Sequence, residues 1–231
     1  MKNKKSKGES DEAQSPPAKM TNFSMAINIF IQLIVVAIAG IIIYRTVKNA
    51  GLILYSLHPV FHSIGYLILM SHAILVIADN NVSTLGYKYS ERVKVHWLLQ
   101  ATALVFITIA QTAIYVNKDL NGYPHFQSTH SYFGFATYML TVSATLGGVL
   151  TKYSSKIKFV KPALLKIGHG FAGIFVYLMA VTTIFLGLNQ SWMEFGDMQF
   201  KVGILFALLV STVYIVSKSF KSFTSRLSKK D

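Results

Sequence analysis

The residues best suited to chemistry are four histidines within long apolar stretches: His58, His96, His130 and His169. Ionisable side chains are rare inside membrane spans, where they face a partner or a functional site. A neutral imidazole ligates a metal through one ring nitrogen while its other nitrogen forms a hydrogen bond. The intervals between alternate histidines match, with 72 residues from His58 to His130 and 73 from His96 to His169. Type and spacing therefore indicate two metal-ligating pairs.

Six apolar segments must position these histidines. Five stretches contain no Asp, Glu, Lys or Arg and exceed the roughly 20 residues needed to cross a bilayer core of ~30 Å. A sixth, 202–217, is shorter, but Lys201 and Lys218 can extend toward water from its ends. Backbone groups in hydrocarbon must be hydrogen-bonded internally, which predicts helices. We expect them at about 22–44, 54–78, 95–116, 128–151, 165–188 and 200–218.

The basic residues alternate between the connections. Of 22 Lys and Arg residues, 18 lie in the two tails, before the third span or between the fourth and fifth spans. The other four are Arg45, Lys48, Lys118 and Lys201. This is the positive-inside pattern, and it predicts a multi-pass membrane protein with both termini cytoplasmic. The net charge of +13 therefore reflects topology, and we expect no nucleic-acid partner.

The topology converts sequence position into depth. The second and fourth spans begin at the outer face, so His58 and His130 lie near that face. The third and fifth begin at the cytoplasmic face, with His96 and His169 close to their starts. The two levels are on the order of 20 Å apart. Hydrogen bonding between helices would account for the presence of any one of these histidines. Four histidines at paired depths instead favour two haems, each with two histidine ligands, inside a four-helix bundle formed by spans two to five.

Small residues near the ligands fit either a flat cofactor or ordinary helix packing. They are Gly65, Gly134, Gly168 and Gly170.

Two further histidines lie in the second span. We favour a packing or hydrogen-bonding role for His62, and a hydrogen-bonded buried role for His72, which a regular helix places on nearly the same face as His58.

The rest of the composition excludes several classes of protein. The chain has no cysteine, which excludes disulfides, iron–sulfur ligation and covalent haem attachment. No G-x-G-x-x-G unit follows a plausible strand, so a built-in nicotinamide or flavin site is not expected. We expect a disordered cytoplasmic tail over 1–21, the six-helix domain over 22–218, and a basic cytoplasmic tail over 219–231.

Four stretches around the histidines resemble the eukaryotic cytochrome b561 family of ascorbate-dependent transmembrane reductases. The resemblance covers about residues 22–218, and the intervals between the last three ligands are also similar. The stretches are Ser56-Leu57-His58-Pro59, Lys94-Val95-His96-Trp97, Ser128-Thr129-His130-Ser131-Tyr132-Phe133-Gly134 and Gly168-His169-Gly170. Trp97-Leu98-Leu99-Gln100 and the position of His125 most resemble the short tumour-suppressor-type subgroup of cytochrome b561 domain proteins.

The resemblance implies two non-covalent haem b groups, on His58/His130 at the outer side and on His96/His169 at the cytoplasmic side. It implies an oxidoreductase in which cytosolic ascorbate reduces the inner haem. The outer haem then passes electrons to a ferric chelate or to monodehydroascorbate. It also suggests a homodimer. We expect an endomembrane location, in the endoplasmic reticulum or a vesicle, rather than the plasma membrane.

Three residues are candidates for substrate contact. Lys94 is similar to a family lysine implicated in ascorbate binding, and Arg92 can assist it, although both also suit a plain cytoplasmic anchor. His125 can meet a substrate at the outer haem or be a solvated loop residue. The chain departs from better-known members at 73–79, where they have a basic, tyrosine-containing helix end, and at Gln100, where a second histidine is frequent.

Two other classes of function are compatible with buried histidines. A histidine-lined metal or proton transporter without haem would want carboxylates at membrane depth, and the five long charge-free stretches contain none. An adaptor with polar helix contacts does not explain the matched depths.

Overall fold

Six helices in the structure are long and apolar enough to cross a membrane. The computed structural model of the protein describes residues 20–156, 160–191, 193 and 195–228. Every regular element in these residues is helical, which confirms the predicted all-α, multi-pass membrane fold. The elements are α1 (Asn22–Ala50), α2 (Leu54–His62), η1 (Ser63–Met70), α3 (Ser71–Ile77), η2 (Val82–Thr84), α4 (Tyr89–Leu120), α5 (Thr129–Lys152), η3 (Ser154–Lys156), α6 (Pro162–Leu188) and α7 (Met198–Ser228).

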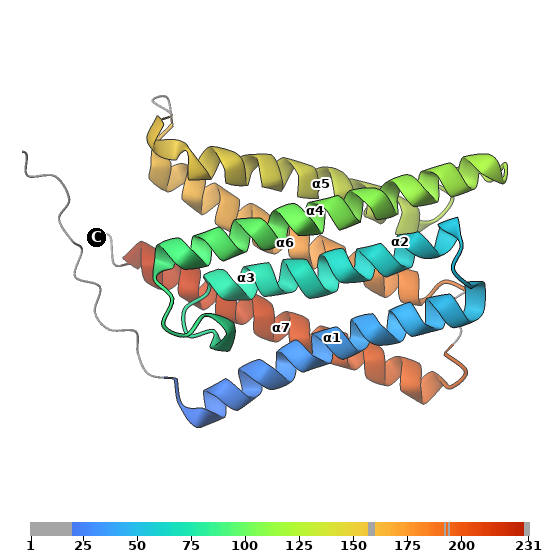
Figure 1. The fold of residues 1–231 in the computed structure, drawn as a ribbon, viewed down its shortest axis with the longest axis horizontal. Coiled ribbons are helices and arrows are strands. Elements are labelled where there is room, and N and C mark those ends of the chain that lie inside the picture. Colours follow the sequence, from blue (N-terminus) through green and yellow to red (C-terminus); the bar gives the residue numbers. More distant parts are fainter. Residues whose placement is uncertain (1–19, 157–159, 192, 194, 229–231) are drawn as a thin grey trace, which may run out of the picture.

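Successive spans run in opposite directions along one long axis (Figure 1). The start of α1, the end of α7 and the connections from α3 to α4 and from α5 to α6 lie at one end of the bundle, which we call the terminal end. The other three connections lie at the opposite, distal end. The α2, η1 and α3 helices follow one another without a break and form the second span, Leu54–Ile77.

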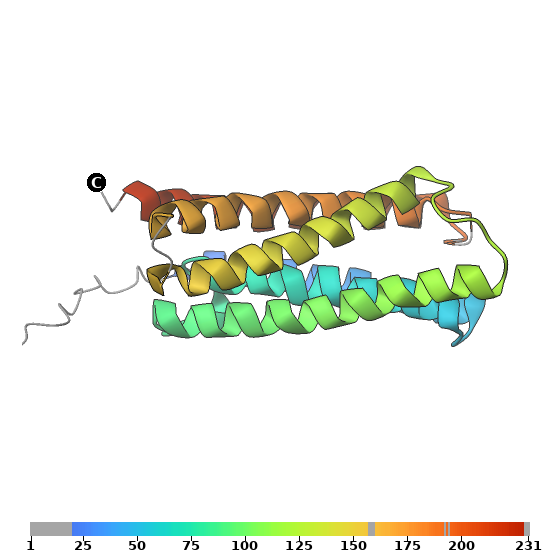
Figure 2. The same cartoon turned by 90° about the horizontal axis from the view of Figure 1, so that it is seen from above.

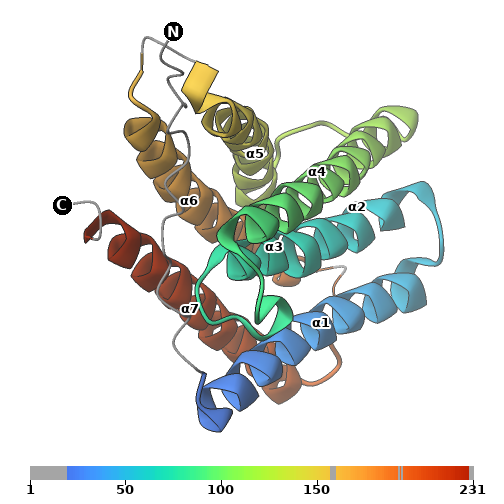
Figure 3. The same cartoon turned by 60° about the vertical axis from the view of Figure 1, so that its left-hand side comes forward.

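The first three and the last three spans form two groups, and the chain passes from one to the other between α4 and α5 (Figure 2). The α4 helix packs on the second span and on α5, while α6 packs on α5 and η1. Spans two to five therefore enclose an interior, as predicted. The α1 and α7 helices pack on one another outside these four spans, with α1 against α2 and η1 and α7 against α3 and α6 (Figure 3).

Several helices extend further than the charge-free stretches predict. The α4 helix begins at Tyr89 rather than near residue 95, and α7 continues to Ser228 rather than ending near 218. A charge-free stretch measures the length inside hydrocarbon, whereas a helix continues into the interface, where Lys and Arg side chains reach water. Residues 219–228 of the expected basic tail are thus helical, and residues 1–19 of the expected N-terminal tail lie outside the described residues.

The second span is not one regular α-helix, which differs from the prediction. Its middle part, η1, is a π-helix, in which hydrogen bonds run from residue i to i+5. The extra residue in the turn rotates later positions by roughly 100° relative to a continuous α-helix. His72 therefore does not share the face of His58, contrary to the prediction from a regular helix.

Hydroxyl groups link the helices where they pack in the bundle interior. The Tyr66 hydroxyl on η1 and the Thr141 hydroxyl on α5 are 3.1 Å apart, and Tyr66 is only 4% exposed. The hydroxyls of Thr137 on α5 and Thr183 on α6 are 3.0 Å apart. In hydrocarbon, close packing and such hydrogen bonds hold helices together, because burial of apolar surface gives no net drive.

We predict that Gly65→Ala destabilises the packing of the second span on α4. A Cβ atom at Gly65 would lie 2.6 Å from Cγ1 of Ile107 and 3.3 Å from the Ala103 carbonyl oxygen. Overpacking of this kind costs about 1–3 kcal/mol, which thermal unfolding in detergent micelles would detect. Gly40→Ala in α1 is the matched control, because no atom lies within 4 Å of its Cβ position. Equal unfolding temperatures for the two variants would contradict the prediction.

Candidate functional site

The four histidines lie in two pairs, one toward each end of the bundle. His58 on α2 and His130 on α5 have ring centroids 6.0 Å apart, with an angle of 88° between the ring planes. His96 on α4 and His169 on α6 have centroids 6.2 Å apart, at 86°. The first pair lies toward the distal end and the second toward the terminal end. Each pair joins two helices that run in the same direction, as predicted.

Local sequence places each histidine of the C-terminal half within the first turns of its helix. Ser128 caps α5, since its hydroxyl accepts a hydrogen bond from the Ser131 amide at 3.3 Å and its amide donates to the Ser131 hydroxyl at 3.1 Å. This reciprocal cap satisfies two amides that the helix cannot pair. Pro162 begins α6, where a missing N–H costs little.

One imidazole of each pair is hydrogen-bonded to a neighbouring helix. His96 Nδ1 lies 2.7 Å from the Ala73 carbonyl oxygen, and His130 Nδ1 lies 3.0 Å from the Thr183 carbonyl oxygen. A carbonyl accepts only, so each Nδ1 is the donor. This assignment leaves Nε2 as the unprotonated nitrogen, the arrangement typical of metal-ligating histidines.

The other imidazole of each pair has no such bond. The Nδ1 atoms of His58 and His169 are buried without a hydrogen bond, although the rings face the backbone of Ala110 and Ala144 respectively. Buried polar atoms nearly always have a partner. The orientation of these two rings therefore rests on packing together with the nearby backbone of Ala110 and Ala144.

Two glycines that the sequence analysis missed lie directly against histidine rings. A Cβ at Gly187 on α6 would be 3.0 Å from Cε1 of His130, and a Cβ at Gly148 on α5 would be 3.0 Å from Cε1 of His169. The contacts are reciprocal, because α5 and α6 are antiparallel. In sequence, each glycine follows the histidine of its own helix by 18 residues, which is five helical turns. That repeated interval could have identified them.

The four glycines chosen from sequence have other surroundings. A Cβ at Gly65 would meet Ile107, and one at Gly170 would lie 2.8 Å from the ring of Phe223 on α7. The nearest side chain to Gly134 is Thr183 at 3.5 Å, and no atom lies within 4 Å at Gly168. Gly65 and Gly170 thus serve close helix packing, the ordinary alternative.

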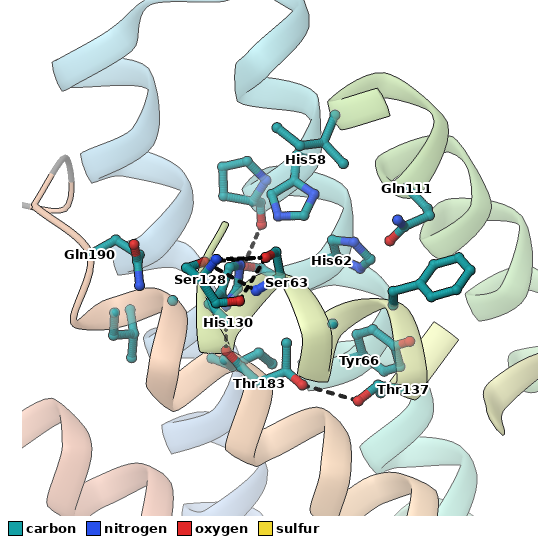
Figure 4. Close-up of a pocket in the computed structure, with 18 of the residues that line it drawn as sticks. His58, His62, Ser63, Tyr66, Gln111, Ser128, His130, Thr137, Thr183 and Gln190 are labelled. Atoms are coloured by element: carbon teal, nitrogen blue, oxygen red, sulfur yellow. Dashed lines mark hydrogen bonds between the residues drawn. The ribbon is translucent and has the colours of Figure 1, made fainter. Parts of the chain in front are cut away.

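A cavity of about 270 Å³ lies beside the distal pair (Figure 4). His58, His62 and His130 line it together with polar groups that include Gln111 and Lys118. A second hollow, of about 330 Å³, lies between α5 and α6 beside His169. Each histidine pair therefore has at least one member that borders a cavity.

Comparison with known proteins identifies the family of the chain. The model of the eukaryotic cytochrome b561 family matches residues 57–194, which include all four histidines. The chain belongs to the eukaryotic cytochrome b561 family. The predicted family is thus confirmed, and membership implies a b-type haem.

Curated relatives confirm the predicted subgroup as well. The chain is 28% identical over 156 residues to the probable transmembrane reductase CYB561D1 of Mus musculus, covering 67% of this chain and 68% of the relative. It is 26% identical over 157 residues to the transmembrane reductase CYB561D2 of Homo sapiens, covering 68% and 71%. It is 30% identical over 152 residues to the probable ascorbate-specific transmembrane electron transporter 1 of Oryza sativa subsp. japonica, covering 65% and 62%.

The centroid separations of both histidine pairs in this b561 chain are compatible with one metal ion between two imidazoles. Two metal–imidazole bonds of about 2 Å each, plus a ring radius of about 1 Å on either side, give a centroid separation of about 6 Å. The measured separations are 6.0 and 6.2 Å. The donor set also fits a non-covalent b haem, because the chain has no cysteine for covalent attachment.

The predicted substrate residues have different surroundings. Lys94 is exposed at the terminal end, with no hydrogen bond or ion pair to another described residue. Arg92 is largely covered, with its side chain 14% exposed and its Nη1 donating to Asp79 at 2.8 Å and to the Ala78 carbonyl at 2.9 Å. Arg92 therefore holds the end of the second span against α4, and Lys94 is the cation open to a solute.

His125 lies at the distal end, among the residues that line the cavity. Its Nε2 is 2.7 Å from Oδ1 of Asp119, and its ring stacks on Tyr115 with centroids 4.5 Å apart. These contacts fix a loop residue in one orientation beside the distal pair. The contact of His125 with an outer substrate stays a prediction.

The second-span histidines differ in their contacts. His72 Nδ1 lies 2.7 Å from the carbonyl oxygen of Ile68 in its own helix, the hydrogen-bonded arrangement that we favoured. His62 packs against the rings of His58 and Tyr66, and its buried Nδ1 has no hydrogen bond. Of the two favoured roles for His62, its contacts are those of packing.

We predict that Gly187→Ala displaces the His130 ring and lowers the haem content of the protein. The added methyl group would lie 3.0 Å from a ring carbon and 3.3 Å from Nδ1, which also disturbs the hydrogen bond to Thr183. Gly173→Ala on the same helix is the control, since nothing lies within 4 Å of its Cβ position. Haem per chain, measured from the absorbance of purified protein, should fall in Gly187→Ala only. Equal content in both variants would contradict the role of this contact.

Proposed function

We propose that this protein carries electrons across a membrane from cytosolic ascorbate, through two b haems, to a one-electron acceptor on the other side. The observation that carries the proposal is the pair of imidazoles, at ligand spacing, toward each end of one membrane-spanning bundle. His58 and His130 would hold one haem, and His96 and His169 the other. When bound, each haem supplies a reversible one-electron couple.

The terminal end is the cytoplasmic end in this proposal. Most Lys and Arg residues belong to the tails and to the connections at this end, which is the positive-inside arrangement. Lys94 is exposed there, two residues before His96. The ammonium group of Lys152 lies 4.3 Å from the ring centroid of Trp97, which follows His96, and adds a second positive charge. An ascorbate anion is attracted to such a face.

The protein's own residues would perform three tasks. Lys94 attracts the donor, the histidine pairs set the positions between which the electron moves, and the apolar bundle keeps the two substrates apart. Each ascorbate monoanion that gives up one electron, and releases one proton to the cytosolic water, becomes monodehydroascorbate. At the distal side, near His125, the electron reduces a ferric chelate to the ferrous state, or reduces monodehydroascorbate, which takes up a proton from water, to ascorbate.

The names of the relatives support the donor and the reaction class. The rice relative is named as an ascorbate-specific electron transporter, and the human relative as a transmembrane reductase.

The alternative function, a histidine-lined metal transporter, receives less support. No group of three or more His, Cys, Asp or Glu side chains suited to a metal ion occurs among the described residues. The homodimer and the endomembrane location remain predictions.

We predict two b haems per chain, both reduced by ascorbate, in reduced-minus-oxidised absorbance spectra of the purified protein. His130→Ala should retain one haem, still reducible by ascorbate, because only the distal pair loses a ligand. His72→Ala is the control and should retain both. Two haems in His130→Ala would contradict the pairing. Haems reduced by dithionite but not by ascorbate would contradict the donor, and a haem-free protein would contradict the whole proposal.

We predict that Lys94→Gln slows reduction by ascorbate several-fold and leaves reduction by dithionite unchanged. One exposed ion pair contributes on the order of 1 kcal/mol, which is about fivefold in a rate or an affinity. The measurement is stopped-flow reduction of the haem absorbance at several ascorbate concentrations. Lys166→Gln, also exposed and at the terminal end, separates a specific contact from the general field. The same slowing in both variants would exclude a specific role for Lys94.

A further inference from the structure

Three of the four paired imidazoles are oriented by a contact with a neighbouring helix. His96 and His130 donate hydrogen bonds to main-chain carbonyls, and the ring of His169 packs against Gly148. His58 lies against the backbone of Ala110 on α4, but its buried Nδ1 has no hydrogen bond of ordinary geometry, and no glycine of the described residues places its Cβ position against the ring. A further contact to this ring comes from its own helix.

His62 contacts His58 directly. The ring centroids are 4.6 Å apart and the ring planes meet at 84°, so one ring presents its edge to the other. The two residues are four positions apart on one helix, where side chains lie one above the other. Both rings border the distal cavity, with His62 deeper in the bundle (Figure 4). This edge-on contact restricts rotation of the His58 ring about its Cβ–Cγ bond.

The ring of His62 is itself held in place. It stacks on Tyr66 with centroids 5.5 Å apart and an angle of 11° between the planes. The Tyr66 hydroxyl lies 3.1 Å from that of Thr141 on α5, the helix that carries His130. The rings of His58, His62 and Tyr66 thus contact one another in turn, from the distal pair toward the middle of the bundle. The last of them, Tyr66, lies within hydrogen-bond distance of α5, the helix that carries His130.

We propose that His62 is a positioning residue that holds the ring of His58 nearly perpendicular to the ring of His130. The proposal rests on the proposed function, because it requires these two imidazoles to share one haem iron. The contacts that this role uses are those of the face and the edge of the His62 ring. A leucine would remove the unpaired nitrogen and also the flat ring.

The consequence is spectroscopic. The electron paramagnetic resonance signal of a low-spin ferric bis-imidazole haem depends on the angle between the two ligand planes. His58 and His130 meet at 88° in the structure. Release of the His58 ring would change this angle, and with it the signal of the distal haem, without removing either ligand.

The experiment compares wild-type protein, His62→Leu, His62→Phe and His72→Leu, each purified with haem. The distal signal is assigned as the one absent from His130→Ala. In His62→Leu we expect haem content to remain at the wild-type level and the distal g values to shift, with the terminal-end signal unchanged. His62→Phe keeps a flat ring and should retain the wild-type distal signal. His72→Leu, in the same span but bonded within its own helix, should change neither signal.

Several results would overturn the assignment. These are an unchanged distal signal in His62→Leu, an equal shift in His72→Leu, or a His62→Phe signal as altered as that of His62→Leu. Wild-type protein with two haems and any of these results would overturn the role of His62 alone. Wild-type protein without haem would instead overturn the proposed function and this inference with it.

Discussion

The fit of each imidazole on α5 and α6 against a glycine of the other helix is the contact on which the rest of the arrangement depends. A Cβ atom at Gly148 or Gly187 would lie 3.0 Å from a ring carbon, closer than ordinary van der Waals contact, so the ring would have to shift. Because the two contacts lie near opposite ends of an antiparallel pair, they fix both the separation of the helices and their register. A shift of α5 along α6 would break both contacts at once. The depths of His130 and His169 are therefore determined together.

The opposing histidines, His58 and His96, come from spans that contact this pair. The α2 and η1 segments are tied to α5 through the hydroxyls of Tyr66 and Thr141, which brings His58 across from His130. The α4 helix packs on the second span, and the bond from His96 to Ala73 sets its ring within that contact. In a membrane, where apolar burial does not favour one helix arrangement over another, such close and directional contacts define the arrangement.

The sequence predicted the spans and the pairing for a simple physical reason. Charge is excluded from hydrocarbon, so the ends of charge-free stretches give depth directly, and helices that start at the same face bring their first turns to the same level. The same reasoning predicted a regular α-helix where the structure has η1, because nothing in the residue pattern of this segment distinguishes i+4 from i+5 hydrogen bonding. It also grouped Arg92 with Lys94, whereas folding pairs Arg92 with Asp79 across a turn. Such pairings depend on how the chain packs beyond each helix.

One imidazole of each pair donates a hydrogen bond of ordinary length to a main-chain carbonyl, His96 to Ala73 and His130 to Thr183. A ring already held in its ligating orientation loses less rotational freedom when it binds a metal. His96 and its acceptor Ala73 both lie in the first three spans. His130 depends on Thr183 in the fifth span. The carbonyl acceptor of His96 thus belongs to the N-terminal half of the chain, whereas that of His130 belongs to the C-terminal half.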